Sequence, residues 1–119
     1  MTSTNLSRPI CILGLGLIGG SLLRDLAAQG VHVYGYNRSG SGARAASAAG
    51  FDASDDLVLT LQRAEQDRAI IVVSTPMPAI PGLLDAIVEH APSCGITDVV
   101  SVKAAVYDLV KERGLEDRY

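Results

Sequence analysis

The stretch from Ile10 to Ser21, ICILGLGLIGGS, constrains the fold of this chain more than any other. An apolar run typical of a buried strand leads directly into a glycine-rich turn, and an amphipathic helix follows the turn. Gly14, Gly16 and Gly19 stand at the spacing G-x-G-x-x-G. That spacing alone is a weak signal, but the strand before it, the helix after it and a second strand about 20 residues further on strengthen it as a dinucleotide-binding turn.

Each glycine has a physical role in such a turn. Gly14 allows the tight turn, Gly16 lets the backbone approach a pyrophosphate, and Gly19 lets the helix pack closely on the strand. The helix is expected to begin at Leu17, so Leu17 and Ile18 lie where free N–H groups and the positive end of the helix dipole would face the phosphates. The alternative is a glycine-rich strand–helix turn that binds nothing.

The rest of the chain alternates between short apolar runs and helical stretches. The pattern predicts strands at 10–14, 31–36, 51–53, 69–74 and 95–100, and helices at 17–29, 43–49, 55–65, 79–90 and 103–113. This alternation indicates a doubly wound parallel sheet, a three-layer α/β fold in one domain over residues 1–119. In the first helix, Ile18, Leu22 and Leu26 are expected to form the buried stripe. Residues 115–119 are expected to stop without a closing element.

Ligands bind such sheets at the carboxyl ends of the strands. The candidate functional loops are therefore 14–20, 37–42, 74–78 and 100–103. In the third loop Thr75 offers a hydroxyl and Pro76 stiffens the turn, which would pass over the nicotinamide half of a dinucleotide. In the fourth loop Ser101 and Lys103 place a hydroxyl beside an ammonium group. They could hold an anionic substrate or orient a base. It is equally consistent with the sequence that Ser101 is a helix N-cap and Lys103 a solvated side chain.

The second loop bears on which dinucleotide would bind. Asn37 stands where NAD-specific chains have an acidic residue that binds the adenosine ribose. Asn37 lacks the carboxylate that would repel a 2′-phosphate. Arg38 can pair with that phosphate, and Ser39 can donate a hydrogen bond to it. These residues favour NADP over NAD. The alternative is that Arg38 is only a solvated loop residue and that the site accepts both cofactors.

Composition excludes several other classes of function. The net charge of −3 gives no basic face for nucleic acid. Residues 1–9 lack a hydrophobic signal core, and no apolar stretch is long enough to span a bilayer. Cys11 and Cys94 lack a C-x-x-C spacing, which favours free thiols over a disulfide framework or a metal site. His32 and His90 are expected to be structural. A cytoplasmic protein without a metal site is predicted.

Taken together, these residues resemble a known family. The segments GLGLIGGSL from Gly14, VYGYN from Val33, VSTP from Val73 and TDVVSVK from Thr97 are similar to the N-terminal nucleotide-binding domain of prephenate/arogenate dehydrogenases. The resemblance covers nearly the whole chain, and the combination with T-D-x-x-S-V-K is its most specific element. It implies a Rossmann-type NAD(P)-binding domain, with NADP as the preferred cofactor and NAD as a second option.

The resemblance also implies a reaction. Prephenate or arogenate would be oxidatively decarboxylated in tyrosine biosynthesis, with hydride transfer to the nicotinamide. Ser101 would assist a catalytic histidine in a His-Pro motif, and a helical C-terminal domain would complete the substrate pocket and a homodimer. Neither is found within residues 1–119. The chain is therefore expected to be truncated before them, and to bind cofactor without turning over substrate.

Two other classes of function share parts of this pattern. Another enzyme of the same sheet type, such as a β-hydroxyacid dehydrogenase or an imine reductase, would have the glycine turn but is expected to lack T-D-x-x-S-V-K here. A non-catalytic module that binds a dinucleotide, or only a protein partner, would need no more than the sheet and the turn. Contacts that separate prephenate from arogenate are expected outside this chain.

Overall fold

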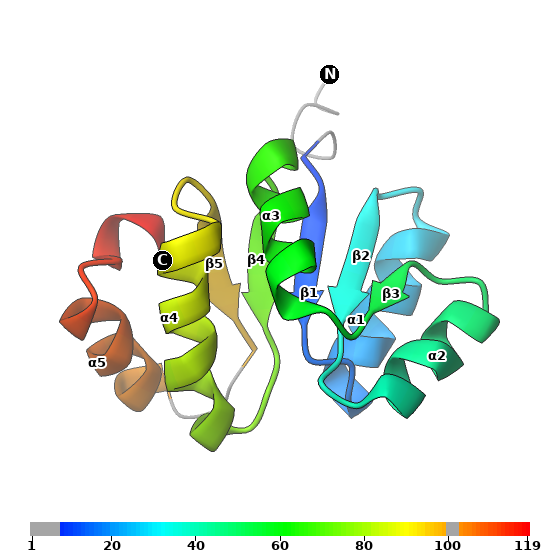
Figure 1. Cartoon of the computed structure of the whole chain (residues 1–119), viewed down its shortest axis with the longest axis horizontal. Helices are drawn as coiled ribbons and strands as arrows, with labels where there is room; N and C mark the ends of the chain where they lie inside the picture. Colours follow the sequence, from blue (N-terminus) through cyan, green and yellow to red (C-terminus); the bar gives the residue numbers. More distant parts are fainter. Residues whose placement is uncertain (1–7, 100–102) are drawn as a thin grey trace.

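The computed structural model describes residues 8–99 and 103–119, which form a parallel sheet flanked by helices (Figure 1). The strands are β1 (Ile10–Leu13), β2 (Val33–Tyr36), β3 (Ala53–Ser54), β4 (Ile70–Val73) and β5 (Gly95–Asp98). They lie in the order β3-β2-β1-β4-β5, and every neighbouring pair is parallel. The predicted doubly wound α/β fold is confirmed, and the order of strands reverses direction at β1.

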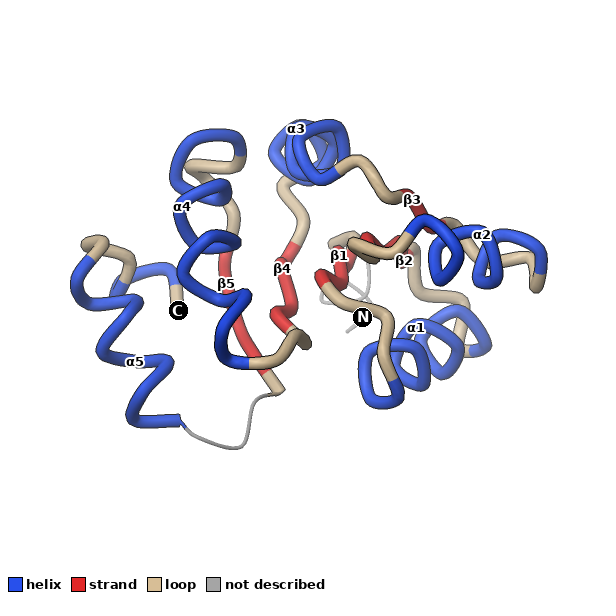
Figure 2. The backbone as a smooth tube through the Cα atoms, turned by 60° about the horizontal axis from the view of Figure 1, so that its bottom comes forward, coloured by secondary structure: helices blue, strands red, loops and turns tan. Residues whose placement is uncertain are grey.

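The helices cover both faces of this sheet. They are α1 (Leu17–Ala28), α2 (Gly40–Ala48), α3 (Leu57–Asp67), α4 (Ile80–His90) and α5 (Lys103–Glu112), with short 3-10 turns η2 (Met77–Ala79) and η3 (Glu116–Arg118). Figure 2 shows α3 and α4 on one side of the sheet and α1 on the other, with α5 beyond β5. In the part of the chain that is described, no helix is long and apolar enough to cross a membrane.

Alternate residues of the central strands pack into different layers. Cys11 and Leu13 of β1 lie in the core shared with α3, α4 and α5, whereas Ile12 packs with Leu23 of α1. These four side chains are at most 2% exposed. Because both faces of β1 and β4 are covered, their sequences are unbroken apolar runs rather than alternating ones. Cys11 is one of two buried free thiols, and burial raises its pKa to about 12.

The buried stripe of α1 differs from the prediction. Gly19 and Leu23 face the sheet, and Leu22 and Leu26 pack beside them, but Ile18 is 59% exposed. The prediction for Ile18 was wrong because the contact of Gly19 with the turn fixes how the helix is rotated. Successive residues point about 100° apart around a helix, so Ile18 faces away from the sheet.

The last five residues also differ from the prediction, because they pack against the sheet edge instead of trailing. Leu115 is 4% exposed and belongs to the core. The Arg118 guanidinium donates to the carbonyls of Ala91 and Cys94 at 2.9 and 3.1 Å. The Tyr119 hydroxyl donates to the Asp98 carboxylate. Burial, followed by this hydrogen bond, raises the pKa of Tyr119 to about 12.

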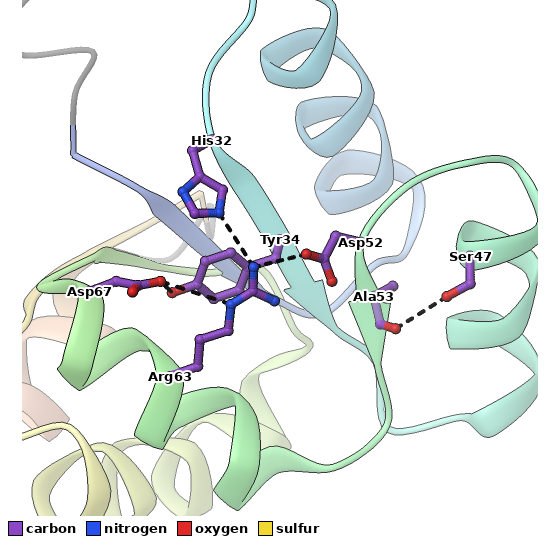
Figure 3. Close-up of polar contacts among 7 residues, drawn as sticks. All are labelled: His32, Tyr34, Ser47, Asp52, Ala53, Arg63 and Asp67. Carbon is purple, nitrogen blue, oxygen red and sulfur yellow. Dashed lines mark hydrogen bonds and ion pairs between the residues drawn. The ribbon is translucent and has the colours of Figure 1, made fainter.

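A cluster of charged and aromatic side chains joins β2 to α3 (Figure 3). The Arg63 guanidinium lies 3.7 Å from the centre of the Tyr34 ring and 2.9 Å from the Asp52 carboxylate. The Tyr34 hydroxyl donates to Asp67 at 3.0 Å, and burial together with this bond raises the pKa of Tyr34. His32 lies just before β2 and contacts Arg63 at 3.3 Å. This contact agrees with the structural role predicted for His32.

Glu65 on α3 gives the fold a dependence on pH. Its Oε1 accepts a hydrogen bond from the Ser93 N–H at 2.8 Å, which lowers the pKa of Glu65 below its ordinary value. A carboxyl whose pKa is lower in the folded state contributes stability above its unfolded pKa and loses it as the pH falls through the folded pKa.

We therefore expect Glu65→Gln to lower the free energy of unfolding at neutral pH, and the difference from the parent chain to shrink as the pH falls through the folded pKa of Glu65. Urea unfolding of both chains at neutral pH and at successively lower pH values measures this difference. A difference that stays constant over that range would contradict the role given to the Glu65 charge.

Candidate functional site

The carboxyl ends of β1, β2 and β4 meet at one cavity of about 720 Å³. This volume is typical of a small-molecule or cofactor site. The cavity lies where the strand order reverses, the position at which doubly wound sheets bind ligands. Its walls are Gly14, Gly16, Tyr36, Asn37, Arg38, Leu57, Ser74, Thr75, Pro76, Pro78, Ala79, Gly82 and Leu83.

The turn after β1 can be built only with glycine at its first position. Gly14 has a φ of 103°, a backbone conformation that residues with a side chain rarely adopt. A Cβ on Gly14 would lie 2.6 Å from both the Ser74 carbonyl oxygen and the Thr75 Cγ2. Two loops, one after β1 and one after β4, are therefore in direct contact at the floor of the cavity.

The other two glycines differ in what surrounds them. A Cβ on Gly19 would lie 1.9 Å from the Gly14 carbonyl oxygen, so α1 packs against the turn with no room for a methyl group. A Cβ on Gly16 would meet nothing within 4 Å, because Gly16 borders the open cavity. Gly16 is also the N-cap of α1, and no side chain caps the first turn. The space and the uncapped helix start fit the phosphates of a dinucleotide.

The loop after β2 brings a positive charge to the same cavity. Arg38 is exposed and lines the cavity together with Gly14 and Gly16. Asn37 also lines it, and its Oδ1 accepts a hydrogen bond from the Leu15 N–H at 3.0 Å. Ser39 is the N-cap of α2, where its Oγ accepts from the Gly42 N–H at 3.2 Å. Arg38 is thus the side chain of this loop that is placed to meet an anion.

The loop after β4 contributes a hydroxyl without a partner. Thr75 Oγ1 is buried and has no hydrogen-bond partner within the described part of the chain. Buried polar atoms nearly always have a partner, and leaving one unpaired costs about 1–3 kcal/mol. Thr75 and Pro76 both line the cavity, whereas the Thr75 Oγ1 atom itself is buried. A ligand would therefore meet this hydroxyl only if the Thr75 side chain rotated toward the cavity.

The structure brings most of the predicted site residues together, though not all of them at the cavity wall. Gly14, Gly16, Asn37, Arg38, Thr75 and Pro76 line it. Gly19 lies behind the turn, and Ser39 caps α2. Leu17 and Ile18, at 90% and 59% exposed, start α1 beside the cavity without lining it. Ser101, the predicted assisting residue, lies outside the described residues.

An apolar wall of the cavity was not predicted. Leu57 comes from the first turn of α3, Leu83 from α4, and Pro78 from η2 between β4 and α4. Both helices start at the carboxyl edge of the sheet, so their first turns face the same space as the loops. The helical spacing of apolar residues marks such positions as core, which is why the pattern alone does not single them out as a binding wall.

A family model and one solved structure match this chain closely. The model described as NADP oxidoreductase, coenzyme F420-dependent, matches residues 9–105. A Corynebacterium glutamicum protein assigned as a prephenate dehydrogenase is 64% identical and superimposes with a TM-score of 0.93. The match covers 95% of this chain and 35% of that protein, so this chain spans about a third of its length. The resemblance predicted from the sequence is confirmed.

More distant structures share the fold alone. A dipicolinate synthase from Bacillus halodurans is 19% identical with a TM-score of 0.64, and its counterpart from Bacillus subtilis is 21% identical with a TM-score of 0.65. Each match covers 92% of this chain and 36% of the other. No match was found among curated proteins.

Proposed function

The chain belongs to the family described as NADP oxidoreductase, coenzyme F420-dependent, and on that basis we propose that its cavity binds a nicotinamide dinucleotide with a preference for NADP. We further propose that the whole protein oxidatively decarboxylates prephenate or arogenate. The domain itself is an oxidoreductase nucleotide-binding domain, so the proposal concerns the choice of cofactor and the substrate.

The cofactor proposal rests on one observation, that Arg38 lines the same cavity as the glycine turn. A dinucleotide with its pyrophosphate at Gly16 would extend toward β2 in one direction and toward β4 in the other. The adenosine half would then meet the loop after β2, where Arg38 supplies a guanidinium for a 2′-phosphate. No described acidic side chain lines the cavity, so nothing there repels that phosphate.

The substrate proposal rests on the relative from Corynebacterium glutamicum and on the segment TDVVSVK. The bound nicotinamide would supply the hydride acceptor, and Thr75 and Pro76 would lie beside that half of the cofactor. Ser101 would assist the catalytic histidine by hydrogen bonding, as the resemblance implies. Release of carbon dioxide from prephenate or arogenate by a full-length protein carrying this domain, with NADP⁺ as oxidant, tests the reaction.

The cofactor proposal predicts that Arg38→Ala weakens NADP⁺ binding by about 10- to 100-fold and changes NAD⁺ binding by less than about threefold. A hydrogen bond to a charged group contributes about 1.5–3 kcal/mol, and each 1.4 kcal/mol is a tenfold change in affinity. Calorimetric titration of the 119-residue chain with both cofactors at matched ionic strength measures the two dissociation constants.

Arg24→Ala is the matched control, because Arg24 is an exposed arginine on α1 that does not line the cavity. We expect it to leave both affinities unchanged. Equal binding of NADP⁺ and NAD⁺ that Arg38→Ala does not alter would contradict the NADP preference. Binding of neither cofactor by the parent chain would contradict the proposed function as a whole.

A further inference from the structure

The side chain of Asn37 connects two loops at the edge of the cavity. Its Oδ1 accepts from the Leu15 N–H at 3.0 Å, and its Nδ2 donates to the Ser39 carbonyl at 3.4 Å. Leu15 lies between Gly14 and Gly16 in the turn after β1, and Ser39 caps α2. The amide therefore links the turn that faces the phosphates to the start of the helix that follows Arg38.

The packing around this amide depends on a second residue, Gly42. A Cβ on Gly42 would lie 2.2 Å from Asn37 Nδ2 and 3.2 Å from its Cγ, so the amide occupies the space that a side chain would take. Glycine within a helix costs about 0.5–1 kcal/mol relative to alanine. Gly42 lies within α2 and has no positive φ that would require glycine. The fit of the Asn37 amide is the physical reason for glycine at this position.

We propose that Asn37 is a positioning residue, which holds the glycine turn in its phosphate-binding conformation and acts on the dinucleotide through the Leu15 backbone. This inference rests on the proposed function. Without the Asn37 side chain, the half-buried Leu15 N–H would lose this hydrogen bond and the turn could adopt other conformations. Binding would then have to order the turn, and that cost would reduce the affinity. Asn37 makes its contact whichever dinucleotide binds, so it serves NADP and NAD equally.

This role differs in its consequences from a direct contact with the adenosine half. A residue that touches the 2′-phosphate changes NADP binding and leaves NAD binding alone, as expected for Arg38. A residue that holds the turn changes both by the same factor, because both cofactors have the same pyrophosphate. The ratio of the two affinities, rather than either affinity alone, separates the two roles.

We expect Asn37→Ala to weaken both NADP⁺ and NAD⁺ by about five- to tenfold, the value of one ordinary hydrogen bond. Asn37→Asp is the conservative variant, because a carboxylate still accepts from the Leu15 N–H. It should restore NAD⁺ binding to within about threefold of the parent chain, while its charge keeps NADP⁺ binding weak. Gly42→Ala displaces the amide without changing a charge, and should weaken both cofactors as Asn37→Ala does.

A readout without cofactor completes the experiment. Amide hydrogen exchange measured by NMR should show the Leu15 N–H exchanging about tenfold faster in Asn37→Ala and Gly42→Ala than in the parent chain and in Asn37→Asp. Thermal unfolding of every variant shows which of them fold. If Asn37→Ala does not fold, the affinities and the Leu15 exchange rate of the parent chain are compared with those of Gly42→Ala and Asn37→Asp.

The outcomes distinguish failure of this inference from failure of the proposed function. A parent chain that binds neither dinucleotide overturns both. A parent chain that binds, with Asn37→Ala weakening NADP⁺ alone or neither cofactor, overturns the positioning role only. Unchanged affinities in Gly42→Ala, or Leu15 exchange that is the same in all variants, overturn it as well.

Discussion

Replacing Gly19 with alanine is expected to lower the free energy of unfolding by about 3 kcal/mol, and to abolish dinucleotide binding in whatever fraction still folds. The added Cβ would lie 1.9 Å from the Gly14 carbonyl oxygen and 2.9 Å from Ser74 Oγ. The carbonyl belongs to the backbone of the turn, which cannot move aside as a flexible side chain can. Either α1 must shift away from the sheet or the turn must change shape, and each loses packing.

Gly20→Ala is the matched control for this prediction, since Gly20 is the next residue of the same helix. A Cβ there would lie 3.5 Å from the Leu15 carbonyl oxygen, an ordinary contact. Alanine is favoured over glycine within a helix by about 0.5–1 kcal/mol, so Gly20→Ala should be neutral or slightly stabilising. Urea unfolding of the parent and both variants gives the comparison. Equal stability of the two variants would show that the turn does not constrain the helix as inferred.

Leu23→Ala is expected to lower the free energy of unfolding by about 2–5 kcal/mol. Leu23 is 2% exposed and packs with Ile12, Val33 and Val72 in the core between α1 and the sheet. Shortening it removes apolar contacts and leaves a cavity that the neighbouring β-branched side chains on rigid strands can fill only in part. Urea or thermal unfolding measures the loss.

Ile18→Ala is the control on the same helix. Ile18 is 59% exposed, and substitutions at such surface positions usually change stability by about 0.5 kcal/mol or less. The contrast tests which residues of α1 form its buried face. A large loss for Ile18→Ala together with a small one for Leu23→Ala would restore the stripe predicted from the sequence and contradict the observed rotation of the helix.

The order and type of the elements could be predicted from the sequence because they depend on local pattern. The apolar run 69–74 predicts a doubly covered strand, and β4 is found at Ile70–Val73. Asp56 is a residue type favoured at helix N-caps, and its Oδ1 accepts from the Leu59 N–H at 3.0 Å at the start of α3. Glycine is favoured just after a helix because it adopts positive φ, and the glycines that follow α1, α2 and α5 all do so: Gly30, Gly50 and Gly114. Each of these features is decided within a few residues of chain.

The candidate site could be predicted only in part, because its walls come from distant segments. The glycine turn and Arg38 follow from motif and position after a strand. Leu57 and Leu83 are apolar residues of predicted helices, and only the packing of α3 and α4 at the carboxyl edge makes them walls of the cavity. Likewise, nothing in the local pattern indicates that the Asn37 amide reaches Leu15, which is 22 residues away in the sequence.

Residue type and short spacing are enough to predict the glycine turn, the alternation of strands and helices and the resemblance to prephenate/arogenate dehydrogenases. The rotation of α1, the packing of residues 115–119 at the sheet edge and the direction of the Asn37 side chain depend instead on contacts between distant segments. The physical reason is steric. The contact of Gly19 with the Gly14 carbonyl fixes one helix, and the space at Gly42 admits one amide. Such contacts exist only once segments far apart in the sequence have packed together.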